Sequence, residues 1–598
     1  MLKSVVLLGF VVLAVSSAQA IVLPLDETGE GENHFVSSNG GVNPPFTGIN
    51  INTFVGANRF YAAGYTGTNS VAANVEAGHM WGGAAGHETL TQVTQYTSFG
   101  APIPQNGETD RHATWVGMMI GGRLTAPANE YQRGITYNST VWSGAIASAW
   151  VGVPYAGSFN FNNSTYLSPY GTFFQTGVGA NNRTADVINS SWGNKYETDG
   201  SWKYTKFVDG LANQNRLTTL VFSVGNEGDG PNTVGGPASG HNSIGAAALT
   251  SDTAVPPYNA VANFSSRGPS DYWDPVNGKI PATTAQRATV DIAAPGTDLT
   301  SAYYGGRSGG NSALLGPADG PAGGVNWYTP GLLGTSFAAP IVAGGVALID
   351  DAGYAVFAAN ANARDGRVVK AVLLNAADKI PGWSNNQTVV NGVLTTTQSL
   401  DFASGAGRMN LDRTFDQYLP IANGGLAGTT DVPGLGGGNV APVGWDYGQV
   451  VVNAPNDYYI NATLAGSTNF SVTLDWYRDR FTDLVNQLPS DVGFANLDLE
   501  FWSTAGGVPQ NLIATSKSLY NEVEHLYFPI PQTGTYMVRV KMLGNIFTQT
   551  GDTDTDREDY GLAWRGAAAA DVIPEPASLS LIGLGLLGLL SRRRRRVA

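Results

Sequence analysis

Apolar and polar residues follow two different patterns along the chain, and the change falls near residue 420. Upstream of it, short β-branched or apolar runs alternate with alanine-rich stretches of helical period, which is typical of βαβ units and a mostly parallel sheet. Downstream, alternation with a period of two indicates antiparallel strands packed as a β-sandwich. The sequence therefore predicts an α/β unit of mostly parallel strands flanked by helices, followed by a smaller all-β unit.

The predicted elements place the polar motifs at junctions between strands and helices. In the first unit we expect strands at 71–75, 186–190, 218–224 and 243–247, and helices at 113–120, 336–351 and 368–377. In the second unit we expect strands at 458–464, 470–476, 497–502, 525–530 and 536–540.

Both ends of the chain have the pattern of targeting signals. Residues 1–20 combine Lys3, an apolar run and small residues ending at Ala20, as in a secretory signal peptide. Residues 571–598 contain Pro-Glu-Pro, a short apolar stretch and five consecutive arginines, and they resemble the PEP-CTERM sorting signal. This resemblance implies export to the cell envelope or surface or secretion from the cell, a transient anchor in the membrane, and cleavage by an exosortase-type enzyme. An ordinary single-pass anchor is the alternative, although the apolar stretch is short for one.

These signals and the two patterns divide the chain into six parts. We predict a signal peptide at 1–20, an N-terminal extension at 21–44, an α/β domain at 45–420, a glycine-rich linker at 421–447, a β-sandwich at 448–566, and the sorting signal at 571–598.

Composition narrows the classes of function that fit. The net charge is −14, whereas nucleic-acid binding needs clustered Lys and Arg, so we expect no nucleic-acid partner. The chain has no cysteine, which excludes disulfides, thiolate metal sites and a cysteine nucleophile. Zinc-binding spacings of histidine are absent as well, so we expect no zinc and no organic cofactor.

Ser336 is the candidate nucleophile, and it lies in the run GTSFAAPIVAG at 334–344. Gly334 permits a tight turn, and the helix formers after it place Ser336 at a helix N-terminus, where free amides favour negative charge. A serine before a helix is often only an N-cap. The catalytic interpretation therefore depends on whether other candidate catalytic residues accompany Ser336 in the sequence.

Two such candidate residues lie upstream of Ser336. His112 opens the run HATWVG and is the candidate general base, while Asn226 follows a predicted strand in the run VFSVGNEG. These three runs resemble the motifs of subtilisin-like serine peptidases, the subtilase or S8 family, with Ala113 and Trp115 replacing the usual Gly and His. The resemblance implies a polypeptide substrate, Ser336 as nucleophile, His112 as base and Asn226 in the oxyanion hole.

The third member of the triad departs from the family pattern. Where the resemblance leads us to expect an aspartate after a buried strand, this chain has Glu76, and we predict that Glu76 orients His112. A carboxylate is needed there to fix the imidazole tautomer. Asp110 is the rival candidate, but it lies just before a predicted helix and has the pattern of a helix-start residue.

The same resemblance assigns two segments to substrate binding. It implies that a substrate peptide pairs as an added strand with residues 191–193 and that its P1 side chain enters a pocket walled by 223–225. We interpret Trp192 as a residue that narrows this pocket or as core packing. The assigned residues are Ser191, Trp192, Gly193, Ser223, Val224 and Gly225.

Metal binding is left open by the sequence. The resemblance suggests structural calcium, and an acidic cluster at 552–559 is one place where it would find oxygen ligands, although the cluster lacks the glycine and final glutamate of an EF-hand. A solvated loop is the simpler interpretation of that cluster.

We thus interpret the chain as an exported serine endopeptidase with a Ser-His-Glu triad. Two alternatives remain. One is a weakly active or inactive binding or matrix protein of subtilase fold, suggested by Glu76 and by an N-terminal extension too short for the usual inhibitory prodomain. The other is a carbohydrate-binding protein that acts through Trp476, Trp502 and Trp564 of the β-sandwich.

Overall fold

The fold is described from a computed structural model of the chain. The predicted signal peptide and sorting signal, and most of the predicted extension and linker, lie outside the described residues. The described residues are 28–33, 49–84, 86–100, 109–126, 130–151, 158–251, 257–302, 328–419, 436–552 and 555–570.

A seven-stranded sheet forms the centre of the α/β unit, and every neighbouring pair in it is parallel. Its middle strands are buried along their whole length because helices cover both faces of the sheet. The strand order is β13 (Ile292–Pro295), β10 (Ile244–Leu249), β9 (Thr219–Ser223), β7 (Val187–Ser190), β2 (Val71–Glu76), β4 (Thr140–Ala145) and β3 (Val93–Thr97).

Successive residues of these strands point into two separate cores. Val187 packs with α3 (Arg111–Gly121), α7 (Thr335–Val356) and α8 (Gly366–Asn375), whereas Ile188 packs with α4 (Asn163–Gly171) and α5 (Lys203–Gln214). Since side chains alternate across a strand, the two helix groups cover opposite faces of the sheet. The predicted fold class of this unit is confirmed, and the predicted strands and helices fall on observed ones.

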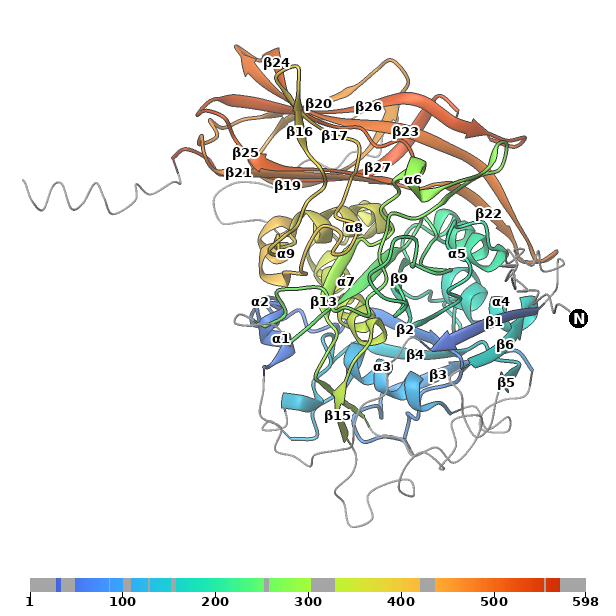
Figure 1. Cartoon of the computed structure of the whole chain (residues 1–598). Helices are drawn as coiled ribbons and strands as arrows, with labels where there is room; N and C mark the ends of the chain where they lie inside the picture. Colours follow the sequence, from blue (N-terminus) through green and yellow to red (C-terminus); the bar gives the residue numbers. More distant parts are fainter. Residues whose placement is uncertain are drawn as a thin grey trace, which may run out of the picture.

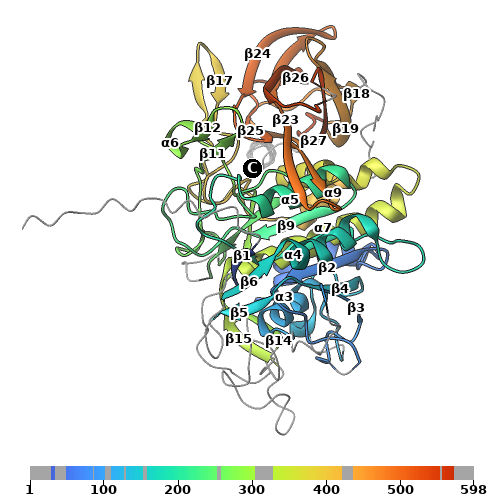
Figure 2. The same ribbon diagram turned by 90° about the vertical axis from the view of Figure 1, so that its right-hand side faces the viewer.

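A small antiparallel sheet lies beside the main one, in the order β5 (Ala149–Val151), β6 (Ser158–Asn162), β1 (Thr28–Asn33) and β8 (Trp192–Gly193). Figure 2 shows β1 next to β6 in the lower half of the molecule. The remaining elements of the unit are α1 (Ile51–Phe54), α2 (Asn58–Ala62), α6 (Ala282–Ala285), α9 (Leu411–Tyr418), β11 (Tyr272–Asp274), β12 (Gly278–Ile280), β14 (Leu299–Ala302), β15 (Tyr328–Leu332), three short turns of helix at Glu130–Gln132, Thr172–Thr176 and Ala361–Arg364, and the hairpin β16 (Thr388–Val390) and β17 (Val393–Thr396).

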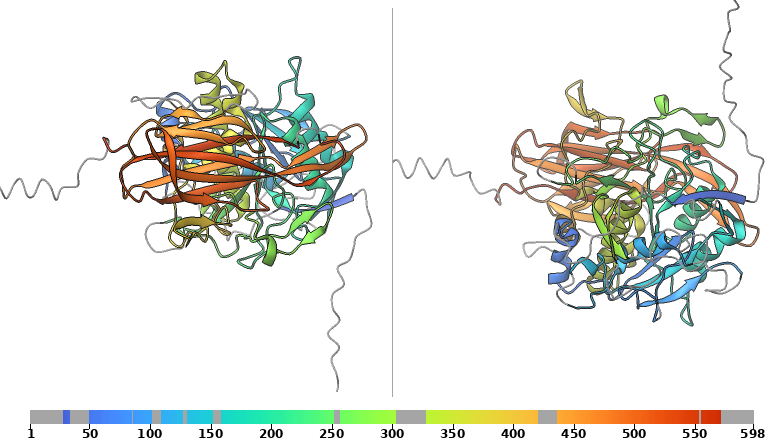
Figure 3. Two further views of the ribbon diagram at one scale, coloured as in Figure 1. Left: turned by 90° about the horizontal axis from the view of Figure 1, so that it is seen from above. Right: turned by 60° about the horizontal axis from the view of Figure 1, so that its bottom comes forward.

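The C-terminal unit is a β-sandwich, which confirms the second part of the predicted fold. Its two sheets enclose an aromatic core that includes Trp476, Phe501 and Trp564. Figure 3 shows its long strands crossing over the α/β unit. One sheet holds β18 (Gly438–Val440), β20 (Asn456–Ile460), β22 (Asp479–Asp483), β23 (Leu488–Ala505), β24 (Val508–Ser516) and β26 (Thr535–Thr548) together with β16 and β17; the other holds β19 (Val443–Val451), β21 (Asn469–Trp476), β25 (Val523–Pro529) and β27 (Arg557–Arg565).

The boundary between the two units differs from the predicted one. The predicted linker at 421–447 includes β18 and most of β19, which belong to the sandwich. The glycines misled the prediction because they weaken a strand pattern. At Gly437 the glycine has a structural reason, since φ is +90° and a Cβ there would lie 2.2 Å from the Asp457 carbonyl oxygen. In addition, β17 of the first unit pairs with β24 of the sandwich.

The sandwich rests directly on the helices of the α/β unit (Figure 1). Buried ion pairs cross the contact, where Arg480 on β22 reaches Asp209 on α5 at 2.7 Å and Lys370 on α8 lies 3.4 Å from Asp475 on β21. The backbones also come close, because a Cβ on Gly561 of β27 would lie 2.4 Å from the backbone of Arg367 on α8. The two units therefore share one buried interface.

The helix α7 is long and apolar enough to span a membrane by length and composition. However, 83% of its apolar window is buried inside the molecule. Its apolar character is therefore explained by its position in the core of the α/β unit.

Candidate active site

Glu76 and His112 meet at the carboxyl edge of the parallel sheet. Glu76 is the last residue of β2, and His112 lies in the first turn of α3. Glu76 Oε2 lies 3.0 Å from His112 Nδ1, and neither side chain is exposed. The arrangement leaves the other ring nitrogen, Nε2, as the atom that would exchange a proton with a substrate or nucleophile.

Asp110 has a different place in the structure. It is the N-cap of α3, and its Oδ1 accepts a hydrogen bond from the backbone N–H of His112 at 3.0 Å. The expectation that it starts a helix is met. Asp110 thus fixes the backbone of His112, while Glu76 contacts the imidazole ring.

Ser336 is the second residue of α7, after a turn at Gly334. Gly334 has φ +146°, a conformation that residues with a Cβ rarely adopt, so the glycine permits the turn. In the first turn of α7 the Thr335 amide donates to Asn226 Oδ1 and the Phe337 amide donates to the carbonyl oxygen of Gly334. The helix dipole favours negative charge at this end of the helix. The sequence prediction of a serine at a helix start is met.

Ser191 forms hydrogen bonds with both Ser336, the candidate nucleophile, and Glu76, the candidate carboxylate of the triad. The N–H of Ser191 donates to Glu76 Oε1 at 2.6 Å, and its carbonyl oxygen accepts a hydrogen bond from Ser336 Oγ at 3.2 Å. The Ser191 hydroxyl in turn donates to the carbonyl oxygen of Ser336 at 2.9 Å. One residue at the end of β7 therefore holds Glu76 and the start of α7 together.

Asn226 is oriented by the residue before Ser336. Its Oδ1 accepts hydrogen bonds from the Thr335 backbone N–H and hydroxyl, both at 3.0 Å. This fixes the amide so that Nδ2 points away from Thr335, and Nδ2 has no hydrogen-bond partner in the described structure. A fixed donor of this kind beside a serine is the chemistry that an oxyanion requires.

The pKa values of the acid-base pair are governed by burial. Loss of water raises the pKa of Glu76 to about 8, and the hydrogen bond from Ser191 opposes this rise. Burial also lowers the pKa of His112 to about 4, against the nearby negative charge of Asp110. Both shifts favour uncharged groups, so an imidazole free of positive charge is available near neutral pH.

Several supporting residues were not found from the sequence. Asn189 donates to Asn74 at 3.0 Å and to the Ser191 hydroxyl at 3.2 Å, and Asn74 donates to the carbonyl oxygen of Ala113 beside His112. Two asparagines in fully buried strands are unusual enough to serve as a signal, since buried amides need partners. The sequence could have identified them on that ground.

Two aromatic rings, one from α3 and one from α7, pack near His112. Phe337 and Trp115 each lie 6.4 Å from the imidazole, measured between ring centroids, and they contact each other. Trp115, which replaces the expected histidine, is therefore a packing residue of the site.

The segments assigned to substrate binding flank the same site. Residues 191–193 run from the end of β7 into β8, and 223–225 follow β9 toward Asn226. Gly225 has φ +106° and donates its N–H to the Thr335 hydroxyl at 3.3 Å. Trp192 is fully buried against Phe159 and Phe161. This geometry fits core packing, and a role for Trp192 in the pocket stays a prediction.

No metal-binding cluster of His, Cys, Asp or Glu occurs among the residues that the structure describes. In the acidic segment at 552–559, Asp556 pairs with Arg557, and Asp559 accepts hydrogen bonds from Tyr447 and Gln449. Residues 553 and 554 of this segment lie outside the described residues. Structural calcium therefore stays a prediction.

Comparison with known proteins identifies the family of the chain. The family model of the subtilase family, Peptidase S8, matches residues 89–407, which is more than half of the chain. The chain therefore belongs to the subtilase family, a family of serine peptidases. The match includes His112, Asn226 and Ser336 and begins after Glu76. A second match, at residues 572–596, is to the PEP-CTERM protein-sorting motif.

The comparisons with curated proteins and with solved structures do not add to the family assignment. No curated protein matches the chain. Among solved structures, one described as proteases from Pseudoalteromonas arctica PAMC 21717 is 16% identical, with 61% of this chain and 94% of that chain covered and a TM-score of 0.39.

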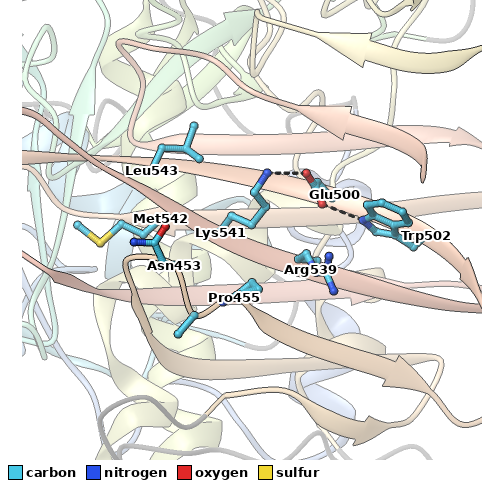
Figure 4. A pocket seen from close by; sticks show the side chains of 9 residues that line it. Asn453, Pro455, Glu500, Trp502, Arg539, Lys541, Met542 and Leu543 are labelled. Atoms are coloured by element: carbon cyan, nitrogen blue, oxygen red, sulfur yellow. Dashed lines mark hydrogen bonds and ion pairs between the residues drawn. The ribbon is translucent and has the colours of Figure 1, made fainter. Parts of the chain in front are cut away.

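The tryptophans behind the carbohydrate-binding alternative do not form a common surface. Trp476 and Trp564 are fully buried in the sandwich core, so they have no face for a sugar ring. Trp502 is partly exposed at a cavity of about 240 Å³. Figure 4 shows its indole N–H and Lys541 both bonded to Glu500. Two of the three tryptophans on which the carbohydrate-binding alternative depends are therefore inaccessible to a sugar.

Proposed function

We propose that this subtilase is an exported serine endopeptidase that works through Ser336, His112 and Glu76. The observation that carries the proposal is the 3.0 Å contact between Glu76 and His112 in a site that also holds Ser336 and Asn226. A carboxylate at Nδ1 fixes the imidazole tautomer in which Nε2 is unprotonated and can act as a base.

The proposed reaction is acyl transfer. His112 Nε2 takes the proton of Ser336 Oγ as this oxygen attacks the substrate carbonyl carbon, and the resulting oxyanion is stabilised by Asn226 Nδ2 and the backbone amide of Ser336. His112 then gives the proton to the leaving amine, and water hydrolyses the acyl-enzyme by the same steps. Glu76 stabilises the imidazolium formed on the way.

The proposed substrate is a polypeptide bound in an extended form. Residues 191–193 would pair with its backbone, and such pairing makes little demand on side-chain sequence. The proposed location is the cell envelope or surface, with an exosortase-type enzyme acting on the matched sorting motif at 572–596.

The test is labelling of residues 21–570 with a fluorophosphonate, which reacts with an activated serine. We expect Ser336→Ala to abolish labelling and Glu76→Gln to slow it by about 10⁴, the effect of losing a triad carboxylate. Asp110→Asn is the matched control, because it removes a charge 3.0 Å from the His112 backbone while leaving Glu76 in place.

Two outcomes would contradict the proposal. A folded wild-type chain that does not react would favour the binding or matrix protein of subtilase fold, and labelling that survives Ser336→Ala would place the nucleophile elsewhere.

A further inference from the structure

Asn74 places an amide in the core between β2 and the helices α3 and α7. It lies two positions before Glu76, and because side chains alternate along a strand, both side chains point to the same face of the sheet. Ala72, on that face as well, packs in the core that α3 and α7 cover. Only 1% of Asn74 is exposed. A buried amide costs free energy unless it is hydrogen-bonded, so its partners define what it can do there.

The amide of Asn74 forms one hydrogen bond to each of two neighbouring elements. Its Nδ2 donates to the carbonyl oxygen of Ala113 in α3 at 3.2 Å, and its Oδ1 accepts from Asn189 Nδ2 in β7 at 3.0 Å. A carbonyl oxygen can only accept, so the orientation of the amide is defined. Ala113 directly follows His112, and Asn74 therefore holds the backbone beside the proposed base.

The same network reaches the start of α7. Asn189 Nδ2 also donates to Ser191 Oγ at 3.2 Å, and this hydroxyl donates to the carbonyl oxygen of Ser336 at 2.9 Å. One chain of hydrogen bonds thus runs from the first turn of α3 through β2 and β7 to the first turn of α7. Asn74 is the member of this chain that reaches α3.

We propose that Asn74 is a positioning residue, which holds the first turn of α3 at the place where a glutamate can reach His112. At the observed position of α3, an aspartate in place of Glu76 would end about one carbon–carbon bond short of His112 Nδ1, which Glu76 contacts at 3.0 Å. The amide of Asn74 and the length of Glu76 are therefore matched. This proposal rests on the proposed peptidase function and adds a residue that sets the geometry of its acid-base pair.

Replacement of Asn74 by leucine tests the proposal, since leucine has nearly the same shape and no polar atom. With a chromogenic tetrapeptide substrate, we expect Asn74→Leu to lower kcat about 10²-fold, the effect of a displacement of about 1 Å in a site, with KM nearly unchanged. Fluorophosphonate should still label Ser336, but more slowly. If the leucine variant does not fold, Asn74→Ser gives the same comparison, because its hydroxyl is too short to reach Ala113.

Asn375 on α8 provides the matched control for loss of a buried amide. Only 2% of it is exposed, it donates to Gln417 Oε1 at 3.2 Å, and it accepts from the Thr473 hydroxyl at 3.2 Å. We expect Asn375→Leu to lower the free energy of unfolding in urea, as Asn74→Leu does, and to leave kcat unchanged. An equal loss of kcat in both variants would show a structural effect alone and would overturn the proposal.

A double-mutant cycle with Glu76→Asp measures whether Asn74 and Glu76 act together. Because Glu76→Asp already withdraws the carboxylate from His112, we expect Asn74→Leu to lower kcat less than about threefold in that background, against about 10²-fold with glutamate present. The same cost with either carboxylate, or no cost with glutamate, would overturn the positioning role. Labelling of wild-type Ser336 by fluorophosphonate would in that case leave the peptidase proposal intact. A wild type that neither hydrolyses the peptide nor reacts would overturn both proposals.

Discussion

At the scale of single residues, the unusual feature is a glutamate where the family pattern led us to expect aspartate. The extra methylene is accommodated at the end of β2, where Glu76 still accepts hydrogen bonds through both oxygens, from His112 and from Ser191. Serine hydrolases with a glutamate in the triad exist on other folds, so the chemistry permits the exchange. What remains distinctive here is complete burial of the pair.

That burial leads to a prediction for the dependence of activity on pH. The pair of Glu76 and His112 has no net charge when it carries one proton besides that of neutral histidine. Release of this proton leaves a buried carboxylate, whose charge is disfavoured by burial. Only the deprotonated pair offers a free Nε2 to Ser336. We therefore expect kcat/KM to rise with pH through a midpoint near 8, the raised pKa of Glu76, rather than near the usual 6.5 of histidine.

A pH–rate profile with a peptide substrate measures this midpoint. The profile of Asp110→Asn serves as control, since Glu76 is unchanged in it. A midpoint at or below 6.5 would show that Glu76 is already ionised in the free enzyme and that the hydrogen bond from Ser191 outweighs burial.

At the scale of elements, the start of α3 positions His112, the proposed base. Asp110 accepts from the His112 backbone N–H, and the Thr114 hydroxyl donates to the Asp110 carbonyl oxygen at 2.7 Å. The first turn is thus fixed on both sides of His112. The cap belongs to the structure of the helix and the imidazole contact belongs to Glu76, so substitutions should separate the two roles.

We expect Asp110→Ala to lower the free energy of unfolding by about 1 kcal/mol, the usual cost of losing an N-cap. Asp110→Asn keeps the acceptor oxygen, so we expect its free energy of unfolding to lie within about a few tenths of a kcal/mol of the wild-type value. Urea unfolding gives the stabilities, and fluorophosphonate labelling reports activity. Loss of labelling in Asp110→Asn as deep as in Glu76→Gln would show that Asp110 is the catalytic carboxylate after all.

At the scale of the whole molecule, the sandwich and the α/β unit share buried charges. Arg480 is fully buried and contacts Asp209 at 2.7 Å and Asp491 at 2.8 Å, and it donates to the carbonyl oxygen of Gly200. Removing one partner of such a network leaves the others buried without compensation. The sandwich is therefore expected to be needed for stability of the catalytic unit.

We expect Arg480→Ala to destabilise the chain by about 3–5 kcal/mol in equilibrium unfolding. The control is Glu130→Ala, which breaks an exposed pair with Arg133 and should change stability by less than about 1 kcal/mol. Similar small effects for both variants would show that the two units are only loosely coupled.

Contiguous patterns let the sequence specify much of this protein. Ser336, His112 and Asn226 were identified because each lies in a contiguous run that resembles a family motif, and the periods of two and 3.6 residues predicted both units. The limits of the sandwich were less accurate, since glycines near 437 hide strands whose close contacts require them.

Other features depend on residues that are far apart in the chain and adjacent in space. The contact of Glu76 with His112, the bridge made by Ser191, and the pair Asn74 and Asn189 exist because parallel strands bring their carboxyl ends to one edge of the sheet. The pairing of β1 with β8 is of the same kind. By itself the sequence determined which chemical groups and secondary structure are present. Only the tertiary structure decided which groups meet, because strand order and register are set by packing across the whole sheet.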